Sequence, residues 1–271
     1  MASPMTTLDE INRHVWNSPT VVTGYEQLNG WTDPGEQAAV RYIAQEMRSQ
    51  PILDMGVGAG RTTVLLQPIS ENYIGIDYTR EMIETCQRRY PRTQYLHMDA
   101  RDLSRFADNQ FALVMFSYNG IDTVDISDRQ QVLREVHRVL RPNGVFIVSA
   151  HNRNGPGCGE RPALRLAFTP NPLKLGWRVL KSLGSLSRAV HNYRRLRALN
   201  EIHDDWAIMN CAAHDFRIVV VYTTLKEQKR QLAAAGFRTE IVFDSIDGEP
   251  VTDTTPTQDS WWFHYLARKV G

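Results

Sequence analysis

The chain has 271 residues, of which 42% are hydrophobic and 23% are charged, and its formal net charge is +1. This composition is typical of a globular protein, and the small net charge gives no electrostatic reason to expect nucleic acid as the main partner. No apolar run reaches the roughly 18 residues that a membrane-spanning helix needs, so we expect no membrane partner.

Three cysteines, Cys86, Cys158 and Cys211, are scattered along the chain. Their spacing fits neither a disulfide framework nor a metal-binding pair, so we expect no metal site. The first residues lack the basic region and apolar run of a secretory signal. A cytoplasmic location is therefore the expectation.

The first 50 residues are predicted to be mostly helical. Residues 33–49 carry a helix-start signature, with Asp33 as the cap, Pro34 at the first helical position and Glu36 three residues after the cap. A short apolar run with strand character follows at 51–56.

Strands and helices alternate after this point. Helical spacing is found at 79–90 and at 127–140, where the turn sequence "RPNG" ends the second helix. The runs that predict strands are 72–77, 93–99, 111–117 and 145–150. This alternation predicts an α/β fold with a doubly wound, mostly parallel sheet of seven strands and right-handed crossovers.

Residues 151–213 depart from the alternation and are predicted to form a helical cap. Between Arg153 and Asn200 there are ten Lys or Arg residues but a single acid, Glu160. This basic segment could be a lid helix with a solvated face, could bind an acidic substrate or could rest on a membrane, although Gly176 and Gly184 interrupt its short apolar face. Strand and helix patterns return over 214–271, which we expect to complete the sheet of a core that begins with residues 1–150. Trp261 and Trp262 should lie on opposite faces of the last strand, so that at most one of them faces a site.

The stretch "ILDMGVGAGRTT" (52–63) joins a strand to a helix through a glycine-rich loop. A dinucleotide fingerprint needs a third glycine where Arg61 stands, and a P-loop needs a Gly-Lys-Ser/Thr sequence that is missing. Asp54, two positions before Gly56, would repel a pyrophosphate but attract an ammonium group. A cofactor with an adenosine part and a cationic tail therefore fits this loop better than a dinucleotide.

At this point the chain resembles the class I S-adenosylmethionine-dependent methyltransferases. The resemblance covers residues 34–150. The motif sequences are similar to those of bacterial small-molecule methyltransferases, which often act in specialised metabolism. The resemblance implies S-adenosylmethionine as the cofactor, with no metal. The residues that would bind this cofactor are Asp54, Gly56, Gly58, Arg61, Asp77, Tyr78, Asp99, Ala100, Phe116 and Ser117.

Individual roles follow from the resemblance. Asp77 would hold both ribose hydroxyls, and Asp99 would accept a hydrogen bond from the adenine amino group beside Ala100. Phe116 and Ser117 would lie beside the transferred methyl, and Arg61 could pair with the carboxylate of the cofactor.

Methyl transfer is an in-line displacement at a sulfonium carbon, so the protein mainly supplies alignment and a dry site. A general base is needed only if the acceptor arrives protonated. His151, Asn119 and Tyr25 are the catalytic candidates. Candidates for contact with the acceptor, a compact metabolite methylated on N, O or nucleophilic C, are Tyr25, Trp31, Tyr118, Asp122, His214 and Tyr222. These aromatic residues would suit an aromatic or indole-like acceptor.

Two alternatives stay open from the sequence. A nicotinamide-dependent oxidoreductase would share the sheet but lacks its third glycine here, and a non-catalytic S-adenosylmethionine-binding protein would keep Gly56 and Asp77 without an acceptor pocket. The expected partner is a small molecule, and a homodimer could form through the cap.

Overall fold

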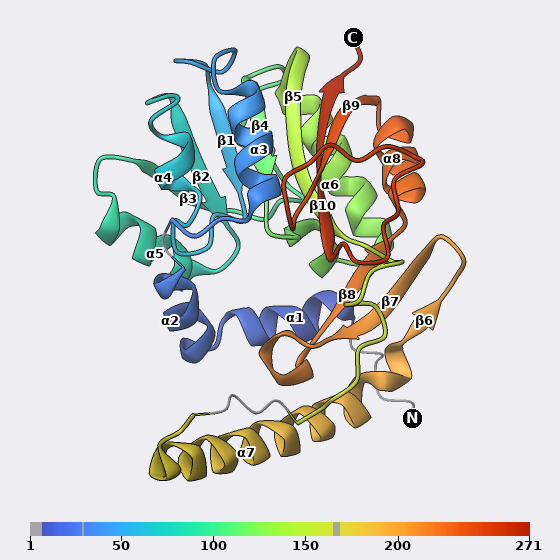
Figure 1. The fold of residues 1–271 in the computed structure, drawn as a ribbon. Helices are drawn as coiled ribbons and strands as arrows, with labels where there is room; N and C mark the ends of the chain where they lie inside the picture. Colours follow the sequence, from blue (N-terminus) through green and yellow to red (C-terminus); the bar gives the residue numbers. More distant parts are fainter. Residues whose placement is uncertain (1–6, 29, 165–168) are drawn as a thin grey trace, which may run out of the picture.

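The computed structural model describes residues 7–28, 30–164 and 169–271, and a seven-stranded sheet forms its centre (Figure 1). In spatial order the strands are β3 (Gln94–His97), β2 (Tyr73–Asp77), β1 (Ile52–Met55), β4 (Phe111–Phe116), β5 (Leu140–His151), β10 (Trp262–Lys269) and β9 (Phe237–Asp244). The first five are parallel, and β10 runs antiparallel to both of its neighbours. The predicted seven-stranded, mostly parallel sheet is confirmed.

Helices cover both faces of this sheet. Neighbouring strand residues point to opposite faces, so that Leu53 packs in one core with Val136 while Ile52 packs in the other with Ile43. The helices are α3 (Pro34–Ile43), α4 (Thr63–Leu66) and α5 (Arg80–Arg89) with the Ile52 core, and α6 (Ile126–Val139) and α8 (Leu225–Ala234) with the Leu53 core. The architecture is therefore doubly wound.

The helix start predicted at Asp33 is confirmed. The Asp33 side chain accepts a hydrogen bond from the Glu36 N–H at 2.8 Å, and Pro34 occupies the first turn. The helix ends at Ile43, six residues before the predicted end.

The cap was predicted to be helical, but it contains strands as well as a helix. It contains one long helix, α7 (Pro172–Leu196), and a three-stranded antiparallel sheet formed by β6 (Glu201–Ile202), β7 (Trp206–Cys211) and β8 (Ile218–Thr223). The sequence assigned the strand after residue 214 to the main sheet, and this assignment is wrong for β8. β8 is an outer strand of the small sheet, but its residues are buried on both faces, which explains its continuous apolar run.

Two N-terminal helices, α1 (Leu8–Trp16) and α2 (Pro19–Gln27), lie between the main sheet and the cap (Figure 1). The side-chain amide of Asn12 accepts from the Val219 N–H at 3.1 Å and donates to the Val219 carbonyl at 2.8 Å. The same amide nitrogen donates to the carbonyl of Thr123 at 2.8 Å, at the end of the short 3-10 helix η1 (Gly120–Thr123). Asn12 therefore ties α1 to β8 and to the end of the main sheet.

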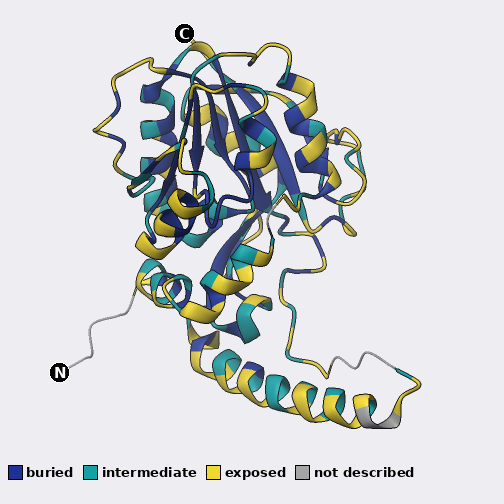
Figure 2. Cartoon of the chain, turned by 90° about the vertical axis from the view of Figure 1, so that its left-hand side faces the viewer, coloured by how far each residue is buried: buried dark blue, intermediate teal, exposed yellow. Residues whose placement is uncertain are grey.

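Burial is concentrated in the main sheet, whereas α7 is largely exposed (Figure 2). In the parts of the chain that the structure describes, no helix has the length and apolar content needed to cross a membrane. From β1 the sheet continues to β2 and β3 on one side and to β4 and β5 on the other, so the direction of strand addition reverses at β1. Ligands of open α/β sheets bind at such a switch point, beyond the carboxyl ends of the strands.

Candidate active site

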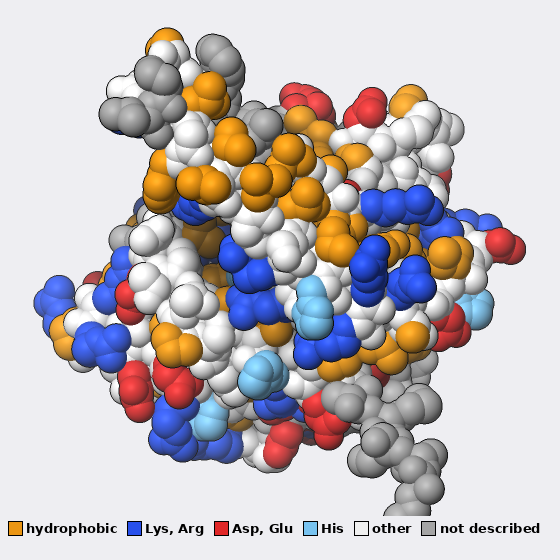
Figure 3. Space-filling view, turned by 90° about the horizontal axis from the view of Figure 1, so that it is seen from below, with side chains coloured by type: hydrophobic (Ala, Val, Ile, Leu, Met, Phe, Trp, Pro, Cys, Tyr) orange, Lys and Arg blue, Asp and Glu red, His pale blue; other side chains and the backbone are white. Residues whose placement is uncertain are grey.

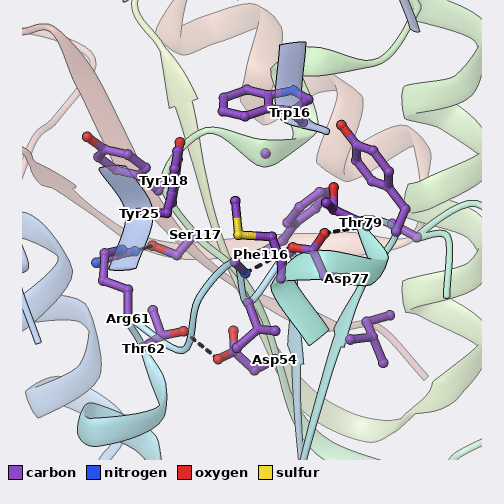
Figure 4. Close-up of a pocket in the computed structure, with 18 of the residues that line it drawn as sticks. Trp16, Tyr25, Asp54, Arg61, Thr62, Asp77, Thr79, Phe116, Ser117 and Tyr118 are labelled. Carbon is purple, nitrogen blue, oxygen red and sulfur yellow. Dashed lines mark hydrogen bonds between the residues drawn. The ribbon is translucent and has the colours of Figure 1, made fainter. Parts of the chain in front are cut away.

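A cavity opens at the carboxyl ends of β1, β2 and β4, and it contains most of the predicted cofactor residues. Figure 4 shows Trp16, Tyr25 and Tyr118 across this cavity from Asp54 and Thr62. The predicted residues that line it are Tyr25, Asp54, Gly56, Gly58, Arg61, Asp77, Tyr78, Ala100, Phe116, Ser117 and Tyr118. We refer to it as the first cavity.

The glycine-rich loop needs its glycines for conformation and for space. Gly56 and Gly58 have φ values of +62° and +55°, in the left-handed region that favours glycine. A Cβ atom on Gly56 would also come within 2.8 Å of the Phe116 ring. The loop can therefore pass close to Phe116 along the wall of the first cavity.

Asp77 ends β2 and connects that strand to the loop. One carboxylate oxygen accepts from the Gly58 N–H at 2.9 Å and the other from the Thr79 N–H at 2.8 Å (Figure 4). The side chain is buried, and burial raises the pKa of this carboxyl despite both hydrogen bonds. Each oxygen has a further lone pair, so Asp77 can still accept from two hydroxyl groups.

Asp54 is a buried carboxylate with one free oxygen. Its Oδ2 atom accepts from the Tyr73 hydroxyl at 2.7 Å and from Thr62, whereas Oδ1 has no hydrogen-bond partner. Burial raises the pKa of Asp54 to about 6. A buried oxygen without a donor at a cavity wall is suited to an ammonium group, so Asp54 fits the cationic tail that the sequence predicted.

Arg61 lines the first cavity but is already paired within the protein. Its guanidinium donates to Glu36 at 2.7 Å, to the Ser117 hydroxyl at 3.0 Å and to the Trp31 carbonyl at 2.9 Å. Burial alone would raise the pKa of Glu36, but the adjacent Arg61 lowers it, so both groups are charged. In this arrangement Arg61 joins α3 to the end of β4, and its contact with a cofactor carboxylate stays a prediction.

Asp99 is placed beside the first cavity rather than in its wall. Its neighbours Met98 and Ala100 line the cavity, whereas its carboxylate accepts from Arg101 at 2.7 Å and from Arg13 of α1. Burial would raise the pKa of Asp99, but the hydrogen bonds from Arg101 and Arg13 lower it to about 2. Its predicted contact with adenine stays a prediction.

A second cavity, of about 520 Å³, adjoins the first. It lies between the ends of β4 and β5, the helices α1 and α2, and the small sheet of the cap. Among its lining residues are the predicted Tyr25, Tyr118, Asn119, His151, His214 and Tyr222. Four side chains line both cavities, namely Trp16, Tyr25, Tyr118 and Thr123.

His151 faces the second cavity from the end of β5. Its Nδ1 atom lies 2.9 Å from Oδ2 of Asp122, which is fully buried, and the Oδ1 atom of Asp122 accepts from Arg129 at 2.6 Å. A carboxylate beside Nδ1 favours a proton on that nitrogen, so the lone pair is on Nε2. The Asn119 amide nitrogen lies 3.3 Å from Nε2. The predicted residues His151, Asn119 and Asp122 thus form one cluster.

The backbone at Tyr118 and Asn119 is held in an unusual conformation. Both have positive φ values, 55° and 61°, and the Asn119 N–H donates to the Ser149 hydroxyl at 2.7 Å. Strained residues of this kind concentrate at functional sites, because the surrounding structure must enforce them.

Aromatic rings form much of the wall that the cavities share. The Tyr25 ring lies 5.6 Å from Trp16 and 6.2 Å from Tyr118, both edge to face, and 6.5 Å from His214. Trp31 and Asp122 are set back from both linings. Trp31 packs against Tyr118 at 5.5 Å, and Asp122 lies behind His151.

Several lining residues were missed by the sequence analysis. The first cavity adds Thr79, Met82 and Met98, and the second adds Cys211, Trp261 and Trp262. The expectation that only one of Trp261 and Trp262 faces a site is wrong, because β10 begins at Trp262 and Trp261 precedes it. No local sequence signal identified Trp16, which reaches both cavities from α1.

Among the described residues no group of three or more His, Cys, Asp or Glu side chains could hold a metal ion. Burial raises the pKa of the Cys86, Cys158 and Cys211 thiols, so they are held in the protonated form.

Comparison with known sequences matches residues 52–144 to a family described as "Methyltransferase domain". A "Probable S-adenosylmethionine-dependent methyltransferase" of Mycolicibacterium smegmatis is 29% identical over 132 residues, which are 49% of each chain. A demethylmenaquinone methyltransferase of Clavibacter sepedonicus is 27% identical over 136 residues, covering 47% of this chain and 54% of the relative. The chain spans about half the length of the curated relatives it matches.

Solved structures match over most of the chain. The 1,6-didemethyltoxoflavin-N1-methyltransferase of Burkholderia thailandensis, solved with its acceptor and S-adenosylhomocysteine, has a TM-score of 0.59 at 16% identity and covers all of this chain and 94% of its own. An S-adenosylmethionine-dependent methyltransferase of Mesorhizobium loti has a TM-score of 0.56 at 18% identity, covering 85% of this chain and 96% of its own. At this level of identity the matches show a shared fold.

Proposed function

We propose that the chain is a class I S-adenosylmethionine-dependent methyltransferase and that it methylates a small-molecule acceptor bound in the second cavity. The observation that carries the proposal is the junction of the two cavities at Trp16, Tyr25, Tyr118 and Thr123. An acceptor and a methyl donor held in adjoining cavities can meet there without exposure to bulk water.

The first cavity has the groups that this cofactor requires. Asp77 would hold the ribose hydroxyls, the free oxygen of Asp54 would hold the ammonium group, and Met98 and Ala100 would lie against the adenine. S-adenosylmethionine, when bound, supplies an electrophilic methyl group on a sulfonium. Phe116 and Tyr118 line this cavity and would limit the access of water to the methyl group.

The walls of the second cavity favour a planar acceptor. Trp16, Tyr25, Tyr118, Tyr222 and Trp262 present rings that can stack on a flat molecule or meet its edge. Relatives named as demethylmenaquinone and 2-phytyl-1,4-naphtoquinone methyltransferases, and the didemethyltoxoflavin enzyme, carry ring compounds in their names. We infer an aromatic or quinone-like acceptor from this combination.

His151 would serve as the general base for such an acceptor. A hydroxyl or ring N–H placed at Nε2 would transfer its proton to that nitrogen, and the buried carboxylate of Asp122 would stabilise the resulting imidazolium. Asp122 is a positioning residue in this scheme, and Arg129 holds it from the other side. Asn119 and Tyr25 would orient the acceptor.

The first experiment is calorimetric titration with S-adenosylhomocysteine and with NADH. We expect binding of S-adenosylhomocysteine at micromolar concentration and none of NADH, and NADH binding would favour the oxidoreductase alternative. The second is incubation with S-adenosylmethionine labelled in its methyl group and a set of hydroxynaphthoquinones, phenols, indoles and ring N–H compounds. Transfer of label to a ring compound supports the proposal, whereas tight cofactor binding without transfer to any acceptor favours the non-catalytic alternative.

A further inference from the structure

The helix α7 is attached to the rest of the protein mainly through its second half. Ala189 and Leu196 are buried, and Asn192 donates to the Asp215 carbonyl at 2.9 Å. Asp215 belongs to η3 (Ala213–Phe216), and its carboxylate accepts from Ser185 at 2.7 Å and Arg188 at 2.9 Å. The first half extends away from the main sheet, at the bottom of the molecule (Figure 1).

This first half carries three large apolar side chains that are about half exposed or more. Trp177 is 63% exposed, Leu180 is 71% exposed and Leu183 is 48% exposed. They recur at intervals of three residues and therefore share one side of the helix. Figure 3 views the molecule from below and shows a band of hydrophobic side chains on this surface, with Lys and Arg beside it.

The charge of α7 has a single sign. Residues 172–196 include six Lys or Arg and neither Asp nor Glu. Lys174 and Lys181 are exposed, and the Lys181 ammonium lies 5.1 Å from the centroid of the Trp177 ring. Arg188 pairs with Asp215, whereas Lys174 and Lys181 belong to the exposed first half and can face an anionic partner.

Two kinds of partner could cover an apolar helix face, and the charge distinguishes between them. In a dimer formed by two copies of this face, cationic side chains would meet each other, which is unfavourable. A surface of anionic lipid headgroups supplies the opposite charge and, just beneath it, an apolar region for Trp and Leu side chains. The observed charges therefore favour a lipid surface.

We propose that α7 lies along the surface of an anionic lipid bilayer, with Trp177, Leu180 and Leu183 inserted below the headgroups and Lys174 and Lys181 against the phosphates. This revises the expectation of no membrane partner, which rested on the absence of an apolar run long enough to span a membrane. The proposal concerns surface attachment and does not depend on the identity of the methyl acceptor.

Flotation of the complete chain with lipid vesicles tests this proposal. We expect the protein to float with vesicles of phosphatidylcholine and phosphatidylglycerol, and at least about tenfold less with phosphatidylcholine alone. The variants W177S/L180S and K174E/K181E should each lower partition into the anionic vesicles by about tenfold or more. Matched controls are I246S/V270S, at apolar side chains of similar exposure, and R48E/K226E, at exposed cations away from α7.

The controls should bind like the wild type, and all variants should keep the wild-type melting temperature because the altered side chains are exposed. Absence of wild-type flotation with anionic vesicles, or equal loss in test and control variants, would overturn the proposal. Light scattering measures the oligomeric state and so tests the alternative that two copies of the chain meet through this face. A dimer that W177S/L180S converts to a monomer, without vesicle binding, would identify the face as a contact between two copies of the chain.

Discussion

His151 and Asp122 stand 29 positions apart in the chain, yet the imidazole Nδ1 of one lies 2.9 Å from a carboxylate oxygen of the other. The same oxygen accepts from the His151 backbone N–H at 2.6 Å. The carboxylate therefore holds both the backbone and the ring of His151, and it leaves Nε2 directed toward the second cavity.

Asp122→Asn tests this pair. An amide has nearly the same shape but cannot stabilise an imidazolium, so we expect kcat to fall by about 100-fold or more with an acceptor that must lose a proton. The substitution also removes the counter-charge of buried Arg129, so activity is compared at a temperature where the melting curve shows the variant folded, and affinity for S-adenosylhomocysteine should then be unchanged. Turnover should recover at alkaline pH, where the acceptor ionises without a base. A kcat within twofold of wild type across the pH range would remove His151 from the mechanism.

Asp77→Ala should weaken S-adenosylhomocysteine binding by about tenfold or more, because it removes the carboxylate that we propose accepts from both ribose hydroxyls. The loss of the acceptor for Gly58 and Thr79 could also disturb the loop, so Asp77→Asn, which keeps one carbonyl oxygen, is measured beside it. Asp102→Ala is the control, since Asp102 is exposed and its carboxylate caps the Ser104 N–H. Wild-type affinity in Asp77→Ala, measured by calorimetry, would exclude the ribose role.

Cofactor affinity should depend on pH through Asp54. The pKa of this carboxyl in the free protein is raised to about 6 by burial, and only the ionised form attracts an ammonium group. Binding therefore lowers this pKa, and affinity for S-adenosylhomocysteine should be full above pH 7 and fall as the pH drops through about 6. Calorimetry in buffers of different ionisation enthalpy should detect proton release near pH 6. A profile unchanged by Asp54→Asn would contradict the assignment.

Glu36→Gln should destabilise the protein strongly. Both side chains of the Glu36–Arg61 pair are nearly inaccessible to solvent, at 1% and 5%, so the substitution leaves a buried guanidinium without its counter-charge. The expected loss is about 3–5 kcal/mol in the free energy of unfolding, measured by urea denaturation. Glu46→Gln breaks an exposed pair with Arg268 and should cost at most about 1 kcal/mol. Equal effects of the two substitutions would show that the buried pair contributes no more than a surface one.

The sheet and the cofactor loop could be predicted from the sequence because their signals are local. Asp54 precedes the last residue of one strand, Gly56 and Gly58 follow in the loop, and Asp77 ends the next strand. The carboxyl ends of parallel strands then meet at one edge, which brings these residues together without knowledge of any side-chain contact.

The contacts that could not be predicted join distant parts of the chain. Asp122 and His151 were both expected near the acceptor, but their hydrogen bond depends on the turn at η1 and on side-chain direction. Arg61 was expected to face the cofactor, and its pairing with Glu36 depends on how α3 packs. The continuous apolar run that identifies β8 as a strand carries no information about which sheet it joins.

The side chain of Asn12 has a consequence for the solubility of the protein. Strand β8 is at one margin of the small sheet, where the backbone of an outer strand offers a template to any extended chain that meets it. At Val219 both outward-facing backbone groups, N–H and carbonyl, are bonded to the Asn12 amide, which imitates the peptide of a neighbouring strand. An extended chain would have to displace α1 before it could pair there, so the Asn12 side chain protects the start of this edge from strand addition.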